Sequence, residues 1–233
     1  ARSVGKGVPE NHKIDWASVA IADGGGAALG AQIASGSVNP YVIAASAIGV
    51  GVYASVAEYD RQKADTTTNN VAMAIDRNEP ICSGWGNLVP ELDNSELGNE
   101  VGLYHNIITE ALVLEEYDFY EHDIEAILLY IVSMYMNYAD ENFDINEIVN
   151  SIVVNGIDNS SGLDSETIDI IEEYNNVALS LDDDNRFSYT YEFIEILNNY
   201  GRYDDVIIQC AIATTYYSSY LWNDYIVDEF ENE

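Results

Sequence analysis

The chain has 233 residues, of which 48% are apolar, and a formal net charge of −33. This apolar content, with 18 tyrosines, is enough to fill the core of a globular domain and argues against a disordered chain. The negative charge repels phosphate backbones and anionic lipid head groups, so nucleic acid is excluded as a partner. Metal cations and basic proteins stay open as partners, although an acidic surface is also explained by solubility alone.

The charge is unevenly distributed along the chain. Residues 1–77 hold six Lys and Arg against seven Asp and Glu, whereas only Arg186 and Arg202 oppose 34 carboxylates from residue 78 onward. We expect a Gly/Ala-rich helical segment over 1–77 and an acidic all-helical domain over 95–233. Prolines and glycines in between predict a linker or ordered loop over 78–94. The alternative is that 14–60 and 95–233 form one continuous core.

Residues 14–60 predict a helical hairpin. Asp15 can cap a helix that runs to about Ser35, and Asn39-Pro40 suits the start of a second helix through Tyr59 or beyond. Small residues recur every four positions in both helices, which lets two backbones approach closely. The glycines that we expect at helix contacts are Gly26, Gly30, Gly49 and Gly51.

The same segment raises the question of a membrane. Tyr41 to Ala57 is 17 residues long, the low end for a spanning helix, and Asp23 lies in the middle of the first helix. We therefore expect a hairpin buried in a protein core, and we keep membrane contact through 14–60 as the alternative.

Helical patterns continue after residue 95. They predict helices over 95–116, 123–139, 144–154, from Asp164 to Leu181, from Ser188 to Tyr200, and from Asp204 or Asp205 to Trp222. The acidic run Asp182–Asp184 predicts a loop. Short connections favour antiparallel neighbours, so the predicted fold class is all-α, an irregular helical bundle with a small-residue-lined N-terminal hairpin.

No cofactor, metal or catalytic motif is found. Asp140, Asn142 and Asp144 suit the start of an EF-hand loop, but Ile145 and Ser151 replace its required Gly and Glu, so helix capping is favoured. His12, His105 and His122 have no paired ligand spacing, and no phosphate-binding glycine loop occurs. Among 41 carboxylates every separation is present, so the sequence selects no pair for glycoside hydrolysis.

Three other groups of residues each allow two interpretations. His105 and Asn106 are the candidate binding residues, since a polar pair midway along an amphipathic helix serves either a ligand or the packing. The cluster Tyr216, Tyr217, Tyr220, Trp222 and Tyr225 suits either a core or a carbohydrate groove. Cys82 and Cys210 are either a disulfide or two separate buried thiols.

The opening Ala22-Asp23-Gly24-Gly25, the Asn39-Pro40 turn and the later Gly102-x-x-His105-Asn106 motif resemble those of uncharacterised exported proteins of gut and environmental bacteria. The early segment is similar to the glycine-zipper stretches of small bacteriocins. The resemblance covers about a third of the chain and implies export, without an active site to carry across. A first residue that is Ala rather than Met agrees with a processed export product.

From these features we expect an extracytoplasmic protein (secreted, periplasmic or surface-attached) with an interaction or structural role. Its partner would be another protein or a second copy of the chain. The alternatives are a membrane-active, bacteriocin-like protein that acts through 14–60, and a hydrolase of glycans or peptides.

Overall fold

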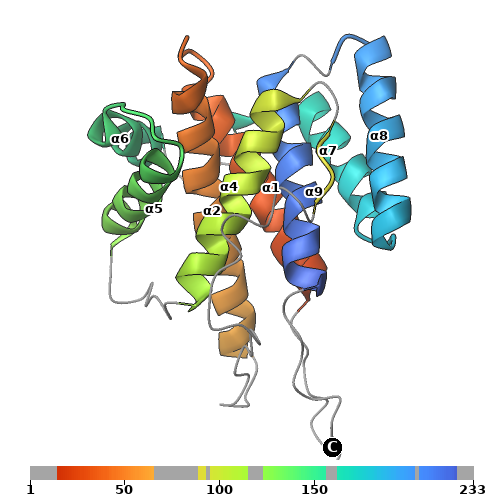
Figure 1. Ribbon diagram of the computed structural model, residues 1–233, viewed down its shortest axis with the longest axis horizontal. Helices are drawn as coiled ribbons and strands as arrows, with labels where there is room; N and C mark the ends of the chain where they lie inside the picture. Colours follow the sequence, from red (N-terminus) through yellow and green to blue (C-terminus); the bar gives the residue numbers. More distant parts are fainter. Residues whose placement is uncertain are drawn as a thin grey trace, which may run out of the picture.

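The computed structural model describes residues 15–65, 89–92, 95–114, 123–155, 162–202 and 205–224. Every regular element in these ranges is an α-helix, which confirms the predicted all-α class (Figure 1). The helices are α1 (Trp16–Ala34), α2 (Pro40–Asp65), α4 (Glu96–Leu114), α5 (Ile124–Tyr138), α6 (Ile145–Asn155), α7 (Ser165–Ala178), α8 (Asp183–Asn199) and α9 (Val206–Asp224).

Aspartate side chains start several of these helices, as predicted. The carboxylates of Asp15, Asp123 and Asp164 each accept a hydrogen bond from the backbone N–H three residues further along the chain, at 3.3, 2.8 and 2.9 Å. Each satisfies a backbone N–H that has no partner inside the helix and places negative charge at the positive end of the helix dipole. Part of the acidity of the chain therefore defines where helices begin.

The prediction of a loop at Asp182–Asp184 was wrong. Asp182 caps α8 by accepting from the backbone N of Asn185 at 3.0 Å, and the next two aspartates lie in the first turn. Carboxylates are favourable there because of the helix dipole, so α8 begins before the predicted Ser188. The preceding helix α7 ends at Ala178, short of the predicted Leu181.

Helix α1 lies at the centre of the bundle. It packs along α2 and α9 and also touches α6 and α7. The consecutive residues 26–31 are all buried, so this part of α1 is covered on every side. The buried apolar residues from Ala27 to Ala34 belong to the same core cluster as those of α2, α4, α5, α6, α7 and α9. The Gly/Ala-rich hairpin and the acidic helices thus share one core.

Close contact between α1 and α2 depends on two of the predicted glycines. A Cβ on Gly26 would lie 2.7 Å from the carbonyl oxygen of Val50, and one on Gly30 would overlap the carbonyl of Ser46. Gly49 instead faces α5 and α6, where a Cβ would lie 3.3 Å from Val132. Gly51 lies beside α1 and α4, at the buried centre described below.

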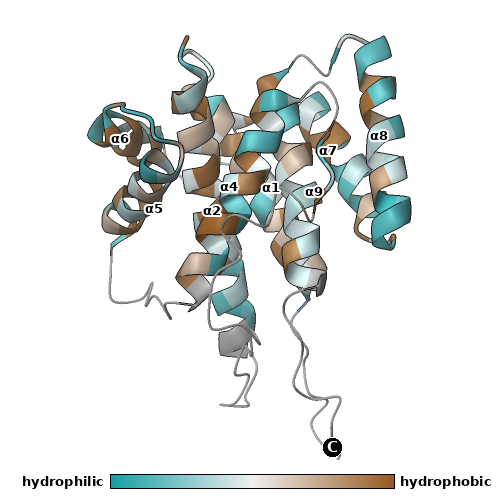
Figure 2. Ribbon diagram, in the orientation of Figure 1, coloured by the Kyte–Doolittle hydropathy of each residue, from teal (hydrophilic) through white to brown (hydrophobic). Residues whose placement is uncertain are grey.

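The outer helices form two pairs. In Figure 1, α5 and α6 lie on one side of α2, and α7 and α8 lie beyond α9. Figure 2 shows hydrophobic residues concentrated on α2 and many hydrophilic residues on α8. The side chains of Tyr216, Tyr217, Tyr220 and Trp222 are buried in the core around α9, which is the packing interpretation of that cluster. Tyr225 lies outside the described residues.

One helix in the described part of the chain, Pro40–Gln62 within α2, is long and apolar enough to cross a membrane. About two thirds of the most apolar 18-residue stretch of this helix is buried inside the protein. A core helix of a globular protein has the same properties, so this helix alone does not distinguish the two interpretations of 14–60.

Candidate functional site

Two motifs that are far apart in the sequence meet in the core. Asp23 of α1 and His105 of α4 are both fully buried, and Asp23 Oδ2 lies 3.9 Å from His105 Nε2. The same oxygen accepts a hydrogen bond from Trp222 Nε1 at 2.9 Å and another from the Ser218 hydroxyl. One carboxylate oxygen therefore joins α1, α4 and α9.

This buried centre is electrostatically costly. Desolvation raises the pKa of Asp23 above its ordinary value, while the proximity of His105 and the hydrogen bonds from α9 and from Ser55 of α2 oppose that rise. His105 Nε2 and the hydroxyl of Thr215 have no hydrogen-bond partner among the described residues. Because unpaired buried polar atoms destabilise a fold, an apolar core would be more stable here.

Glycines provide the space for this centre. A Cβ on Gly51 would lie 3.3 Å from both the carbonyl oxygen of Asp23 and Cδ2 of His105. A Cβ on Gly24 would collide with Thr215 of α9. Gly24 and Gly51 therefore let four helices, α1, α2, α4 and α9, approach around one carboxylate.

The Gly102-x-x-His105-Asn106 motif joins α4 to α9. Asn106 is buried, its Nδ2 donates to the carbonyl oxygen of Tyr217 at 2.7 Å, and its Oδ1 lies 3.3 Å from His105 Nδ1. A Cβ on Gly102 would lie 2.5 Å from the Tyr217 ring. The two candidate binding residues thus lie in the core and contact other parts of the protein.

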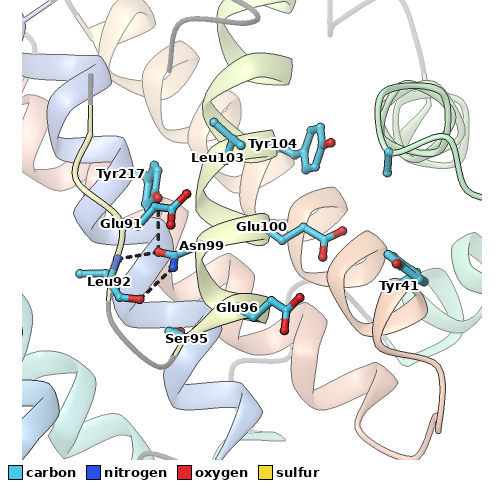
Figure 3. Close-up of a pocket in the computed structure, with 11 residues that line it drawn as sticks. Tyr41, Glu91, Leu92, Ser95, Glu96, Asn99, Glu100, Leu103, Tyr104 and Tyr217 are labelled. Carbon is cyan, nitrogen blue, oxygen red and sulfur yellow. Dashed lines mark hydrogen bonds between the residues drawn. The ribbon is translucent and has the colours of Figure 1, made fainter. Parts of the chain in front are cut away.

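A pocket of about 790 Å³ opens on α4, next to this motif. Its lining combines carboxylates, tyrosines and a few small or apolar side chains: Tyr41, Glu91, Leu92, Ser95, Glu96, Asn99, Glu100, Leu103, Tyr104, Ala139 and Tyr217. Figure 3 shows Glu96 and Glu100 pointing from α4 towards Tyr41, and Glu91 beside Tyr217 on the other side of the helix. None of these glutamates has a sequence motif that marks it as a site residue.

Asn99 positions one wall of this pocket. Its Oδ1 accepts from the backbone N of Leu92 at 2.9 Å, and its Nδ2 donates to the carbonyl oxygen of Leu92 at 2.8 Å. Tyr217 Oη also donates to Asn99 Oδ1, at 3.3 Å. These bonds hold the segment with Glu91 against α4 and α9.

Glu100 is the most enclosed carboxylate of the pocket. Partial burial raises its pKa, a hydrogen bond from Tyr135 opposes the rise, and the charges of Glu141 and Glu96 add to it. On the opposite wall, a hydrogen bond with Glu141 is the largest cause of a raised pKa for Tyr41. The pocket is therefore a concentrated negative region at the protein surface.

The described arginines do not neutralise this region. Arg61, Arg186 and Arg202 form their ion pairs elsewhere, with Glu58, Asp183 and Glu166. The pocket thus presents carboxylates that no described arginine pairs with.

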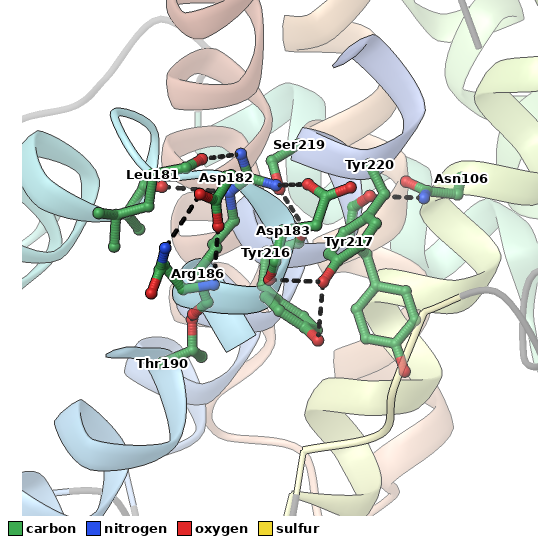
Figure 4. A network of polar contacts seen from close by, with 12 residues as sticks. Asn106, Leu181, Asp182, Asp183, Arg186, Thr190, Tyr216, Tyr217, Ser219 and Tyr220 are labelled. Carbon is green, nitrogen blue, oxygen red and sulfur yellow. Dashed lines mark hydrogen bonds and ion pairs between the residues drawn. The ribbon is translucent and has the colours of Figure 1, made fainter. Parts of the chain in front are cut away.

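Arg186 forms a separate buried network (Figure 4). Only 2% of its side chain is exposed, and its Nε donates to the carbonyl oxygen of Ala178 at 3.1 Å. Its other nitrogens donate to the carbonyl of Leu181 and to Asp183, and its guanidinium lies 5.5 Å from the Tyr220 ring centroid. This network ties α7, α8 and α9 together.

The other residues that the sequence offered as site candidates either have a structural role or lie outside the described residues. Asp144 caps α6 by accepting from the backbone N of Asn146 and Glu147 at 3.0 and 3.2 Å. Within the described ranges, no group of three or more His, Cys, Asp and Glu is placed to hold a metal ion. Cys210 is buried, and burial raises the pKa of its thiol to about 12. Cys82, His12 and His122 lie outside the described residues.

No protein-family model, curated protein or solved structure matches this chain.

Proposed function

We propose that this chain is an extracytoplasmic interaction protein that binds a positively charged partner in the pocket on α4. The observation that carries the proposal is the set of three glutamates, Glu91, Glu96 and Glu100, in one open pocket without a described arginine as partner. A negative concave surface attracts cations and increases their association rate.

The composition of the pocket supports a cationic ligand. Carboxylates form charge-assisted hydrogen bonds with ammonium and guanidinium groups, and tyrosine faces attract the same groups. Tyr41, Tyr104 and Tyr217 line the pocket together with the glutamates. Tyrosine is also enriched at protein interfaces, because its ring supplies contact area and its hydroxyl a hydrogen bond.

The proposal is tested by calorimetric titration of the full chain with hexalysine peptide at low and high salt. We expect binding that weakens with salt and is lost in the variant Glu91→Gln/Glu96→Gln/Glu100→Gln. The matched control, Glu172→Gln/Glu192→Gln/Glu195→Gln, removes the same charge from exposed positions of α7 and α8 and should bind normally. Equal weakening in both variants would show that only overall charge attracts the peptide, and would overturn the proposal.

A hydrolase of glycans is the second candidate, because Glu96 and Glu100 share the pocket and burial raises the pKa of Glu100. A carboxyl group with a raised pKa beside a second carboxylate is the arrangement of a general acid and its partner. Hydrolysis of chromogenic glycosides that disappears in Glu100→Gln would support it. A screen in which the wild type releases no chromophore from any of the glycosides would dismiss it.

A further inference from the structure

We infer that Asp23 of α1 and His105 of α4 hold one proton between them, and that this buried pair is a pH-sensitive lock on the attachment of α1 to the bundle. Neither residue lines the pocket on α4, so the inference is independent of the cation-binding function proposed above.

Asn106 determines which ring nitrogen of His105 carries a hydrogen. Its Nδ2 donates to the carbonyl oxygen of Tyr217 at 2.7 Å, and a carbonyl oxygen only accepts, so the orientation of the amide is defined. Its Oδ1, which is 3.3 Å from His105 Nδ1, is therefore an acceptor, and Nδ1 carries the hydrogen. In the neutral ring Nε2 then has a lone pair, so a second ring proton has to bind at Nε2.

The free ring nitrogen faces the carboxylate of Asp23. Nε2 of His105 lies 3.9 Å from Asp23 Oδ2 and has no hydrogen-bond partner among the described residues. This distance is within the range of an ion pair but too long for a hydrogen bond, so a proton belongs to one atom or the other. The same Oδ2 accepts from the Trp222 indole at 2.9 Å and from the Ser218 hydroxyl. The pair therefore has two proton-binding atoms that face each other.

Burial limits the pair to one proton. Both side chains are fully buried. Without a proton the carboxylate is a buried charge without a counter-charge, and with two protons the imidazolium is; either state is costly in a core. One proton leaves the pair without net charge, as an imidazolium beside a carboxylate or as two neutral groups. The two residues thus titrate as a unit.

His105 is the titratable group that faces Asp23. The other described side chains that contact the carboxyl group are Ser55 of α2 and Ser218 and Trp222 of α9, which form hydrogen bonds and do not titrate at these pH values. The described arginines form ion pairs with other carboxylates. The pair therefore depends on its own proton for neutrality.

The next titratable groups on the surrounding helices do not replace this proton. Burial raises the pKa of Tyr59 on α2 to about 12 and also raises that of Tyr217 on α9, so both phenols stay neutral. The other buried acid of α4 is Glu110, five positions after His105 and so about 140° around the helix axis.

Loss of the proton weakens the attachment of α1. Desolvation raises the pKa of Asp23, so the folded pair keeps its proton where the unfolded chain, with ordinary values of about 3.9 for Asp and 6.5 for His, has released both. The stability from this proton is lost as the pH rises through the value of the folded pair. A buried charge then remains on Oδ2, the atom that joins α1 to α4 and α9. Alkaline pH therefore opens the lock, and neutral to mildly acidic pH keeps it closed.

The test of the shared proton is NMR of the ¹⁵N-labelled full chain between pH 5 and 9, following the His105 ring nitrogens and the Trp222 indole N–H. We expect both signals to change with one midpoint, because the indole donates to the oxygen of the pair. In Asp23→Asn no counter-charge is left, so Nε2 should stay unprotonated and the indole signal should not titrate. Asp169→Asn, at an exposed position of α7, is the matched control and should keep the wild-type midpoint.

His105→Gln is the second variant, and it keeps the test decisive if Asp23→Asn does not fold. It retains the carboxylate, so the Trp222 signal should still titrate, with a midpoint shifted by more than about one pH unit. Separate midpoints for His105 and Trp222 in the wild type would show that the two groups bind protons independently. An unchanged His105 midpoint in Asp23→Asn, or an unchanged Trp222 midpoint in His105→Gln, would show the same, and each of these results overturns the inference.

Urea unfolding at the same pH values tests the lock. Above about pH 6.5, and up to the midpoint found by NMR, the unfolding equilibrium constant of the wild type should rise about tenfold per pH unit relative to that of Asp23→Asn. Asp169→Asn should follow the wild type. A ratio between wild type and Asp23→Asn that does not change with pH would mean that the proton does not hold α1 in place, and would overturn the lock.

Discussion

Substitutions of Asp23 test whether the buried charge of its carboxylate destabilises the core. In Asp23→Ala, the indole N–H of Trp222 and the hydroxyl of Ser218 lose the oxygen that they share. Each stranded buried donor costs about 1–3 kcal/mol, so the free energy of unfolding should fall by about 2–6 kcal/mol. Asp23→Asn keeps one oxygen for both donors and removes the charge, so at pH 7 it should be within about 1 kcal/mol of the wild type or more stable.

The difference in the free energy of unfolding between Asp23→Asn and the wild type should change with pH in one direction. The pKa of Asp23 is raised in the folded state, above an unfolded value of about 3.9, so the folded protein keeps a proton that the unfolded chain has lost. The stability from this group is present below the unfolded pKa and is lost as the pH rises through the folded pKa. The difference between Asp23→Asn and the wild type should therefore grow in favour of the variant as the pH rises, by at most about 1.4 kcal/mol per unit.

The assay is urea unfolding, followed by circular dichroism, at several pH values between 5 and 8. The other carboxylates contribute equally to the free energy of unfolding of both proteins, so their contribution cancels in the difference between Asp23→Asn and the wild type. Asp169→Asn makes the same chemical change at an exposed position of α7 and should stay within about 0.5 kcal/mol of the wild type. If Asp23→Asn is as destabilising as Asp23→Ala, or the difference from the wild type shrinks as the pH rises, the charge of Asp23 stabilises the core and the reasoning is refuted.

Three further predictions concern packing and charge. Gly30→Ala should destabilise the fold by several kcal/mol, because its methyl group overlaps the α2 backbone, whereas Gly25→Ala has open space and should stabilise by about 0.5–1 kcal/mol; thermal unfolding compares the two. Arg186→Lys should cost about 3 kcal/mol, because the buried guanidinium has several partners, and Arg61→Lys, on an exposed side chain, less than about 1 kcal/mol by urea unfolding. Cation affinity should fall as the pH drops through the raised pKa of Glu100, because its protonated form no longer attracts the ligand; titration calorimetry at several pH values shows whether the loss begins above the ordinary range of a glutamate.

Helix positions could be predicted because their signals are local. Asp15, Asp123 and Asp164 each precede a helical apolar pattern, and all three cap the expected helix. The error at Asp182 has a physical explanation, since an acidic run is also the usual composition of a first helical turn. Charge alone did not distinguish a solvated loop from a capped start.

The meeting of Asp23 and His105 could not be predicted, because it depends on how helices distant in the sequence pack. Both residues belong to motifs that the sequence analysis selected, but a periodic pattern gives only the face of a helix and not the partner of that face. The glutamates of the pocket had no signal at all among 41 carboxylates. What distinguishes them is the curvature of the surface between α2, α4 and the segment 89–92, which forms only in the folded protein.

The cation-binding and membrane-active functions make opposite demands on α2. Tyr41 at the start of α2 forms one wall of the pocket and Glu100 of α4 faces it, so a ligand between them holds the two helices together. Insertion of the α1–α2 hairpin into a bilayer requires these helices to separate, and it also exposes the Asp23 and His105 pair to lipid. A ligand at one hundred times its dissociation constant stabilises the closed form by about 2.7 kcal/mol, which reduces the open population about a hundredfold.

We therefore expect saturating hexalysine to suppress any leakage that this chain causes in dye-loaded phosphatidylcholine vesicles, which carry no net charge to bind the peptide. The variant Glu91→Gln/Glu96→Gln/Glu100→Gln, which lacks the pocket charges, should leak equally with and without hexalysine. Leakage by the wild type that hexalysine leaves unchanged, although calorimetry shows that it is bound, would mean that the hairpin reaches the membrane without separating α2 from α4. Such a result would contradict the shared core as the barrier to insertion, because the buried faces of α1 and α2 are covered by the same helices that form the pocket.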